Sequence, residues 1–270
     1  MNMKSYFCKE MMIMGLLHHD VTVLDFDHVY EQQPALTERA DAWIDLSNIE
    51  ATNLFCTQEA MEEIRRRLAA RKTSGITYIG SGNYHYVSYA LLSEIDRPFT
   101  LVLFDNHTDA KRSDQLPGML TCGSWVAEAM AHLPSMRQVV WVGVRSDPFP
   151  SCSGNRSRTV LLPELKHPEQ LLSAVGTNDI YISIDKDVLD EADAVTNWDH
   201  GKMRLKQLIV ALHTLIMSKN VVGIDVCGEL KTSPADEWKY AEKQRLNEQA
   251  NLAILEAGMF QQKTDYKHIS

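Results

Sequence analysis

The chain has 270 residues, with 27 Lys and Arg against 36 Asp and Glu, so its formal net charge is −9. An apolar fraction of 44% is ordinary for a globular protein and argues against disorder. The acidic balance argues against a nucleic-acid or membrane partner, because nucleic acids and anionic membranes both require a basic face. This length fits one α/β domain spanning residues 1–270.

Short apolar runs alternate with helical patterns along the chain. Apolar runs without polar alternation are typical of strands covered on both faces. The predicted strands are Val21–Phe26, Ile76–Gly80, Thr100–Asp105, Gln138–Val142, Ile180–Asp185 and Val221–Val226. The predicted helices are Gln58–Lys72, Val87–Ile95, Gly123–Leu133, Arg204–Lys219 and a segment from Ser233 to about Glu256. This alternation predicts a three-layer α/β/α fold with a mostly parallel central sheet.

The cysteines and the N-terminal region bear on location. The chain has 5 cysteines and no CxxC pair, which argues against a disulfide framework and suits a reducing compartment. The apolar stretch Met11–Leu17 is too short to cross a bilayer and lacks a signal-peptide cleavage site. We therefore expect a cytoplasmic protein.

The strongest motif is a run of metal-ligand side chains directly after the predicted strand at residues 100–105. Asp105, His107 and Asp109 occupy alternate positions there. In an extended segment, alternate side chains point the same way, so these three could hold one or two cations. The alternative is an Asx-type turn with a solvated histidine.

Two further strand ends carry similar residues. Asp185 and Asp187 close the run at residues 180–185, and His85 follows a glycine-rich turn after residues 76–80. The bland alternatives are a pair of acids that cap a turn and a structural histidine. In parallel sheets, however, ligands bind beyond the carboxyl ends of the strands, where all these side chains are expected.

Taken together, these residues predict a metal centre without sulfur ligands. The inventory is two histidines and four aspartates, so a structural zinc site is disfavoured. Oxygen-rich ligation with some imidazole suits Mn²⁺, and also admits Fe²⁺, Co²⁺ or Zn²⁺. Six ligands exceed the need of one ion, so two ions about 3.5 Å apart fit better.

The sequence from about Ile76 to Leu230 resembles the ureohydrolase superfamily of arginase, agmatinase, guanidinobutyrase and formimidoylglutamase. The family motifs G-G-D-H-S, D-A-H-x-D and S-x-D-x-D-x-x-D-P correspond here to residues 82–86, 105–109 and 183–191. The resemblance implies an arginase-like fold with two Mn²⁺ per chain. It assigns His85 and Asp109 to one ion and His107 and Asp187 to the other, with Asp105 and Asp185 bridging.

The resemblance also implies the chemistry. Family members hydrolyse a C–N bond of a guanidino, amidino or formimino small molecule through a metal-bridging hydroxide, which Asp109 would help to orient. It further suggests a homo-oligomer.

The chain departs from the family at several places. Cys122 stands where arginase-like members have a proton-shuttle histidine; it is either a thiol relay or a small residue packed at a helix start. Glu229 is displaced by one position from the acid that holds the guanidinium, and the Asn-Pro that follows that acid is missing; with a rebuilt loop, Glu229 could take the place of that acid in the catalytic site. A loop containing Asn197, Trp198 and Asp199 replaces a Gly/Pro/Thr-rich loop, and it could form a substrate wall or plug the core.

These departures leave two alternative functions open. One is an amide hydrolase or deacetylase-like enzyme on the same fold, with a single zinc. The other is a metal-binding relative without catalytic activity.

Overall fold

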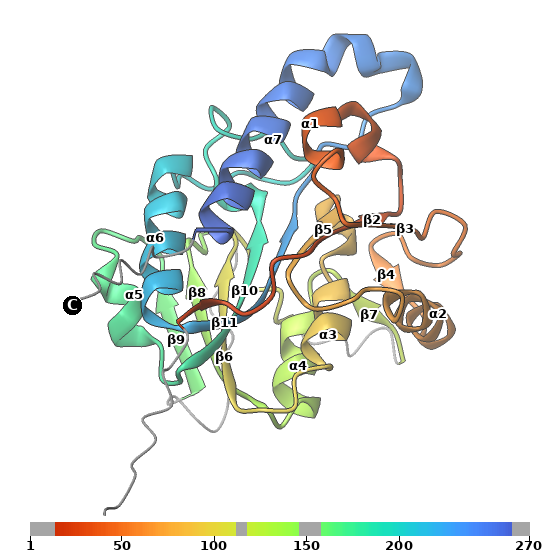
Figure 1. The fold of residues 1–270 in the computed structure, drawn as a ribbon. Coiled ribbons are helices and arrows are strands. Elements are labelled where there is room, and N and C mark those ends of the chain that lie inside the picture. The colour runs from red at the N-terminus through yellow and green to blue at the C-terminus, as the bar shows by residue number, and fades with distance from the viewer. Residues whose placement is uncertain (1–13, 112–117, 146–157, 261–270) are drawn as a thin grey trace, which may run out of the picture.

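The structure is a computed structural model that describes residues 14–111, 118–145 and 158–260. A nine-stranded sheet forms its centre, in the order β3-β2-β5-β11-β10-β6-β8-β9, with β1 beside β11 (Figure 1). The strands are β1 (Gly15–Leu16), β2 (Val21–Asp25), β3 (Ala42–Asp45), β5 (Ile76–Gly80), β6 (Phe99–Phe104), β8 (Met136–Val142), β9 (Thr159–Leu162), β10 (Asp179–Asp185) and β11 (Asn220–Cys227). Each pairing described for this sheet is parallel. A separate antiparallel pair joins β4 (Phe55–Cys56) to β7 (Leu120–Thr121).

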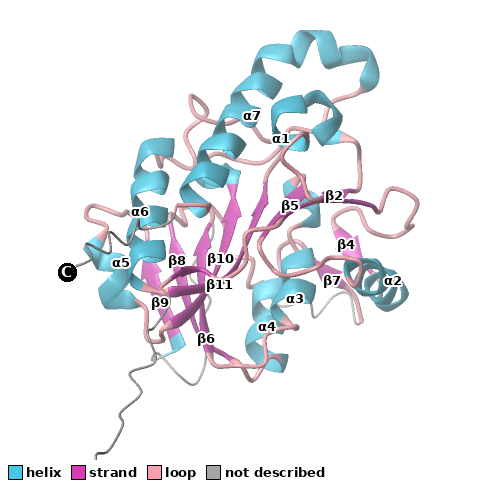
Figure 2. Ribbon diagram, in the orientation of Figure 1, coloured by secondary structure: helices cyan, strands magenta, loops and turns pink. Residues whose placement is uncertain are grey.

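Helices cover both faces of the sheet (Figures 1 and 2). One face carries α1 (Pro34–Thr37), α5 (Glu169–Ala174), α6 (Leu205–Ser218) and α7 (Glu237–Gly258), and the other carries α2 (Gln58–Leu68), α3 (Val87–Leu92) and α4 (Trp125–His132). Two buried apolar clusters match these layers: Leu212 and Ile254 pack with Ile182 of β10, whereas Ile64 belongs with Leu103 of β6. The predicted α/β/α fold with a mostly parallel sheet is confirmed.

The local sequence explains the elements that carry the site. All six residues of β6 are buried, as its continuous apolar run predicts. In α2, the buried Met61, Ile64 and Leu68 lie three and four positions apart, and the Thr57 hydroxyl accepts a hydrogen bond from the Ala60 amide as an N-cap. Because β5, β6, β10 and β11 run parallel side by side, their carboxyl ends meet at one edge of the sheet.

The structure differs from the sequence-based prediction mainly at the periphery. β3 and β9 were not predicted; β3 alternates in burial and the four residues of β9 are all partly exposed, so neither has a buried apolar run. The helix predicted from Ser233 begins as a 3-10 turn over Pro234–Asp236, and α7 starts at Glu237. Cys56, Cys122 and Cys227 are free thiols, while Cys8 and Cys152 lie outside the described residues.

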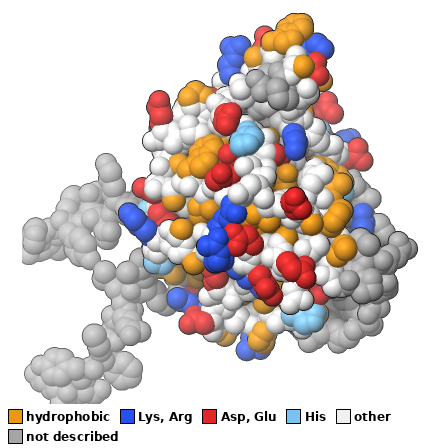
Figure 3. Space-filling view, turned by 90° about the vertical axis from the view of Figure 1, so that its right-hand side faces the viewer, with side chains coloured by type: hydrophobic (Ala, Val, Ile, Leu, Met, Phe, Trp, Pro, Cys, Tyr) orange, Lys and Arg blue, Asp and Glu red, His pale blue; other side chains and the backbone are white. Residues whose placement is uncertain are grey.

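On the face drawn in Figure 3, Lys and Arg side chains are interspersed with Asp and Glu, without an extended basic patch among the described residues seen there.

None of the helices in residues 14–111, 118–145 and 158–260 is long and apolar enough to cross a membrane.

Candidate metal centre

The structure brings all six predicted metal ligands together at the carboxyl edge of the sheet. His85 follows the 3-10 helix η2 (Gly82–Tyr84) after β5, and Asp105, His107 and Asp109 follow β6. Asp185 ends β10 and Asp187 lies in the next turn, η4 (Lys186–Val188). Five of the six residues are buried and His107 is half-buried.

The distances divide the site into two ends. His85 Nδ1 lies 3.0 Å from Asp109 Oδ2, 3.4 Å from Asp105 Oδ2 and 3.6 Å from Asp185 Oδ2. At the other end, His107 Nδ1 lies 2.8 Å from Asp187 Oδ2 and 3.6 Å from Asp105 Oδ1. Asp105 thus faces one histidine with each of its oxygens, which is the position of a bridging ligand.

A relay of hydrogen bonds orients His85. Ser183 donates its hydroxyl proton to Asp225 Oδ1 at 2.7 Å, and His85 Nε2 lies 2.9 Å from the same hydroxyl oxygen. Since the hydroxyl proton is used on Asp225, this oxygen accepts from His85 Nε2–H. A cation that displaced the proton from His85 Nδ1 would therefore find the lone pair of this nitrogen directed at it, as a metal ligand requires.

The loop after β6 is fixed by its own backbone. The amide of His107 donates to Asp105 Oδ1 at 2.6 Å, and the amide of Asn106 donates to Asp187 Oδ1 at 3.0 Å. Asp109 adopts φ 49°, a left-handed conformation that costs about 1–2 kcal/mol for a residue with a Cβ. The buried indole of Trp125 donates to Asp109 Oδ2 at 2.7 Å and holds the carboxylate in that position.

Burial and crowding of like charges perturb the ionisable groups. Burial, followed by repulsion from Asp109 and Asp187, raises the pKa of Asp105 well above its usual value. Burial and Asp187 likewise raise the pKa of Asp185 to about 6. Burial lowers the pKa of His85, but the carboxylates around it outweigh this effect and raise that pKa to about 10.

The unpaired atoms of this group fit divalent cations. His85 Nδ1 and Asp105 Oδ2 are buried and have no aligned hydrogen-bond partner within the described part of the chain. Ligand atoms of His85, Asp105 and Asp109 lie within 4.8 Å of one another, as do those of Asp105, His107 and Asp187. Carboxylates packed this closely repel one another, and bound cations remove that cost.

Cys122 lies near the carboxylates but outside these groups. Its thiol is partly exposed, and burial together with Asp109 and Asp185 raises its pKa to about 12. The amide of Cys122 donates to the Leu54 carbonyl, which adjoins the β4–β7 pair. A relay through Cys122 stays a prediction.

Glu229 binds residues of the protein itself, whereas the family resemblance connects it with a substrate guanidinium. Its Oε1 accepts hydrogen bonds from Lys186 and from Asn251, and its Oε2 accepts from Gln33 at 2.8 Å and Asn247 at 3.2 Å. The side chains of Glu229 and Lys186 are both 0% exposed. With both oxygens occupied, Glu229 belongs to none of the metal-ligand groups found among the described residues.

The predicted substrate loop borders the site. The ring of Trp198 meets the ring of His107 edge-on with centroids 5.8 Å apart, and its indole donates to Asn83 Oδ1 at 3.1 Å. The side chain of Asn197 bonds to the backbone of Lys231, and the carbonyl of Asp199 accepts from Asn106. A Cβ at Gly82 would stand 2.8 Å from Asp185 Oδ2 and 3.1 Å from Trp198, so glycine permits this close approach.

Sequence reasoning missed several supporting residues. Ser183 and Trp125 form hydrogen bonds with the predicted ligands His85 and Asp109, Asp225 accepts from Ser183, and the Cys227 thiol lies 3.2 Å from Asp185 Oδ2. The pairing of Asp185 with Cys227 in the register of β10 and β11 places these side chains together. Only the strand order could have revealed it, because the two residues are far apart in the sequence.

Comparisons with known proteins identify relatives with a similar sequence and a similar fold. A protein described only as uncharacterized, from Thermotoga maritima, is 33% identical over 89% of this chain and 90% of its own length. The structure is similar to that of proclavaminate amidino hydrolase from Streptomyces clavuligerus (TM-score 0.62, 15% identity, 91% of this chain and 94% of that one). It is also similar to formimidoylglutamase from Bacillus subtilis (TM-score 0.61, 14% identity, 91% and 87%).

The sequence profile of the Arginase family matches residues 26–235, well over half of the chain. That span includes all six predicted metal ligands and each of the strand ends that carry them. The chain therefore belongs to the arginase family.

Proposed function

We propose that this chain is a binuclear metal-dependent hydrolase that cleaves a C–N bond in a guanidino, amidino or formimino small molecule. The observation that carries the proposal is the set of six buried or half-buried candidate ligand side chains, which come from three strand ends and lie in overlapping groups of three. Membership of the arginase family and the similarity to an amidino hydrolase and a formimidoylglutamase support the same reaction class.

The distances support a division of the ligands between two ions. His85 and Asp109 would hold one ion, and His107 and Asp187 would hold the other. Asp105, which faces both histidines, and Asp185 would bridge them. The oxygen-rich set suits Mn²⁺, with Fe²⁺, Co²⁺ and Zn²⁺ as the other candidates.

Two cations bound there would activate water and stabilise the charge that develops in the transition state. The protein's own groups do the rest. Asp109, held by the Trp125 indole, is placed to accept a proton from water, and the edge of Trp198 would face a flat guanidino or amidino group. The buried Glu229 would act on the backbone between Asp185 and Asp187 through Lys186, and not on the substrate.

The two alternative functions would use the candidate ligand set differently. A single-zinc amide hydrolase would leave part of the ligand set without a cation, and a relative without activity would keep costly buried carboxylates for binding alone. The cytoplasmic location, the single domain over residues 1–270 and the homo-oligomer stay predictions.

A substrate screen tests the proposal. Protein incubated with Mn²⁺ is assayed against guanidino, amidino and formimino compounds, with urea, formamide and ammonia as readouts. We expect turnover of at least one compound and its loss in Asp105→Ala and Asp185→Ala. Asp96→Ala, at a side chain 93% exposed and remote from the ligand groups, is the control and should keep full activity. Two bound ions with no turnover across the panel would overturn the proposal.

A further inference from the structure

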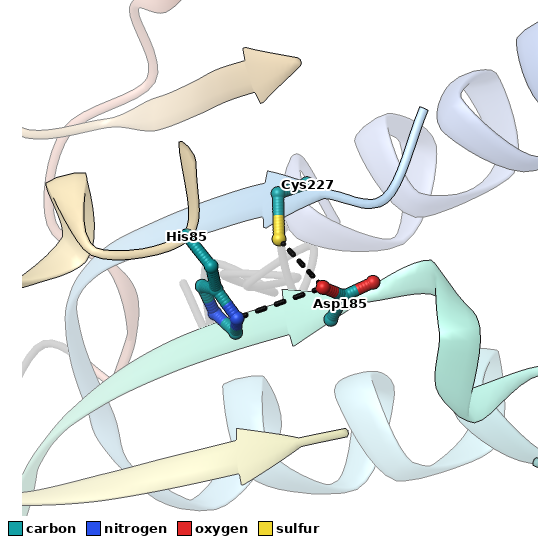
Figure 4. Close-up of side chains that lie close together, drawn as sticks. All are labelled: His85, Asp185 and Cys227. Carbon is teal, nitrogen blue, oxygen red and sulfur yellow. Dashed lines mark hydrogen bonds and ion pairs between the residues drawn. The ribbon is translucent and has the colours of Figure 1, made fainter. Parts of the chain in front are cut away.

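Cys227 stands at the centre of the sheet, directly against the metal centre. It is the last residue of β11, pairs in register with Asp185 of β10, and is 0% exposed. Figure 4 shows its thiol and the His85 ring both directed at the carboxylate of Asp185. The sulfur lies 3.2 Å from Asp185 Oδ2, and His85 Nδ1 lies 3.6 Å from that same oxygen.

These three side chains form a group of ligand atoms in their own right. One atom each from His85, Asp185 and Cys227 lies within 4.8 Å of the other two, and all three residues are buried. His85 also belongs to the group with Asp105 and Asp109. A cation at the His85 end is therefore within reach of a sulfur atom as well as of oxygen and nitrogen.

Two independent features indicate that the thiol is more than core packing. His85 Nδ1 is buried and has no aligned hydrogen-bond partner within the described chain, and it points into the group that contains the sulfur. Gly228 has φ 87°, and a Cβ there would stand 2.4 Å from Asp185 Oδ1, so the chain can turn away beside Asp185 only because glycine follows Cys227.

We propose that Cys227 supplies a thiolate ligand to the cation at the His85 end, which gives this centre one sulfur donor. The inference rests on the metal centre proposed above. The thiol loses its proton to solvent when the cation binds, so no further reactant is needed. A thiolate favours thiophilic cations, so this end of the centre should prefer Zn²⁺, Co²⁺ or Fe²⁺ to Mn²⁺.

Cobalt spectroscopy tests the ligand directly. Metal-free protein is loaded with Co²⁺, the bound metal is counted, and the near-ultraviolet spectrum is recorded. We expect a thiolate-to-cobalt charge-transfer band that disappears in Cys227→Ser while cobalt stays bound. The matched control is Cys122→Ser, because Cys122 is also a free thiol near the carboxylates; it should keep the band.

A second measurement uses the natural chain, so its result does not depend on whether a variant folds. X-ray absorption of the zinc-loaded natural chain should show a sulfur neighbour at about 2.3 Å from the metal. Bound metal with neither the charge-transfer band nor the sulfur neighbour would overturn the role of Cys227 and leave the proposed hydrolase standing. A protein that binds no metal at all would overturn both.

Discussion

Lys186 and Glu229 form an ion pair that is completely shielded from solvent, between the two aspartates proposed as metal ligands on one side and three amide side chains on the other. Lys186 separates Asp185 from Asp187, so the contacts that fix its side chain also fix the backbone that carries these two aspartates. A buried charge loses its hydration, and only full pairing makes it tolerable.

Breaking this pair should destabilise the fold strongly. Glu229→Gln leaves the Lys186 ammonium buried without a counter-charge, so we expect a loss of about 3–5 kcal/mol in the free energy of unfolding, measured by urea denaturation. Lys186→Met together with Glu229→Gln should recover much of that loss. The control is Asp193→Asn, which breaks an ion pair with the exposed Arg204 and should cost about 1 kcal/mol or less. A loss below 1 kcal/mol for Glu229→Gln would contradict the pair's structural role.

Asp105→Asn should be at least as stable as the natural chain without metal but less stable than it when metal is bound. Without metal, burial and neighbouring carboxylates disfavour ionised Asp105, so the variant should be at least as stable as the natural chain. With metal at 100 times its Kd, the natural chain should gain about 2.7 kcal/mol, and the variant much less. Thermal unfolding in chelator and in excess Mn²⁺ measures both. An equal gain in thermal stability on adding metal in both proteins would show that Asp105 is not a metal ligand.

Asp27 makes the fold sensitive to pH away from the metal ligands. Its side chain is 2% exposed, and burial raises its pKa from 3.8 to about 6 despite Lys231, whose Nζ lies 3.7 Å away. An acid whose pKa is raised in the folded state binds more protons folded than unfolded. Its ionisation therefore destabilises the fold as pH rises from about 4 to 6, and the full penalty persists above that range.

Asp27→Asn should remove this penalty. We expect the variant to be more stable than the natural chain by roughly 1–3 kcal/mol at pH 8, and by less at pH 5. Urea denaturation at the two pH values measures the difference. A gain that grew towards pH 5 would have the wrong sign for a raised pKa.

Trp125→Phe should weaken metal binding by removing the indole donor to Asp109 Oδ2. Loss of a group that orients a metal ligand typically costs 10- to 100-fold in metal affinity or activity, roughly what we expect in a Mn²⁺ titration. Ile64→Ala, in the same apolar cluster but on α2, controls for general destabilisation: it should lower stability by about 2–5 kcal/mol without changing metal affinity. Equal affinity in Trp125→Phe and the natural chain would refute the orienting role.

The sequence was sufficient to predict the layers and to single out six candidate ligand residues, which the structure brings close together, because both inferences depend on local patterns. Continuous apolar runs identify buried strands, and the ligands follow the strands directly, as Asp105 follows β6. Edge strands such as β3 were missed, since an exposed edge carries no continuous apolar run.

The residues around the ligands depend on contacts between distant segments, and these cannot be deduced from one sequence. Gln33 reaches Glu229 across 196 positions, and Cys227 meets Asp185 through the order of two strands. The family motif led to Glu229 as a substrate-binding acid; its occupied oxygens become visible only when α1, α7 and the end of β11 are placed together.

The rate of C–N hydrolysis against equivalents of Mn²⁺ per chain, measured on metal-free protein with a substrate from the panel, tests the central claim most directly. The rate should rise to a plateau at two equivalents, and Asp185→Ala should stay at background throughout. A plateau at one equivalent, or a background rate while two ions are bound, would contradict a binuclear hydrolase.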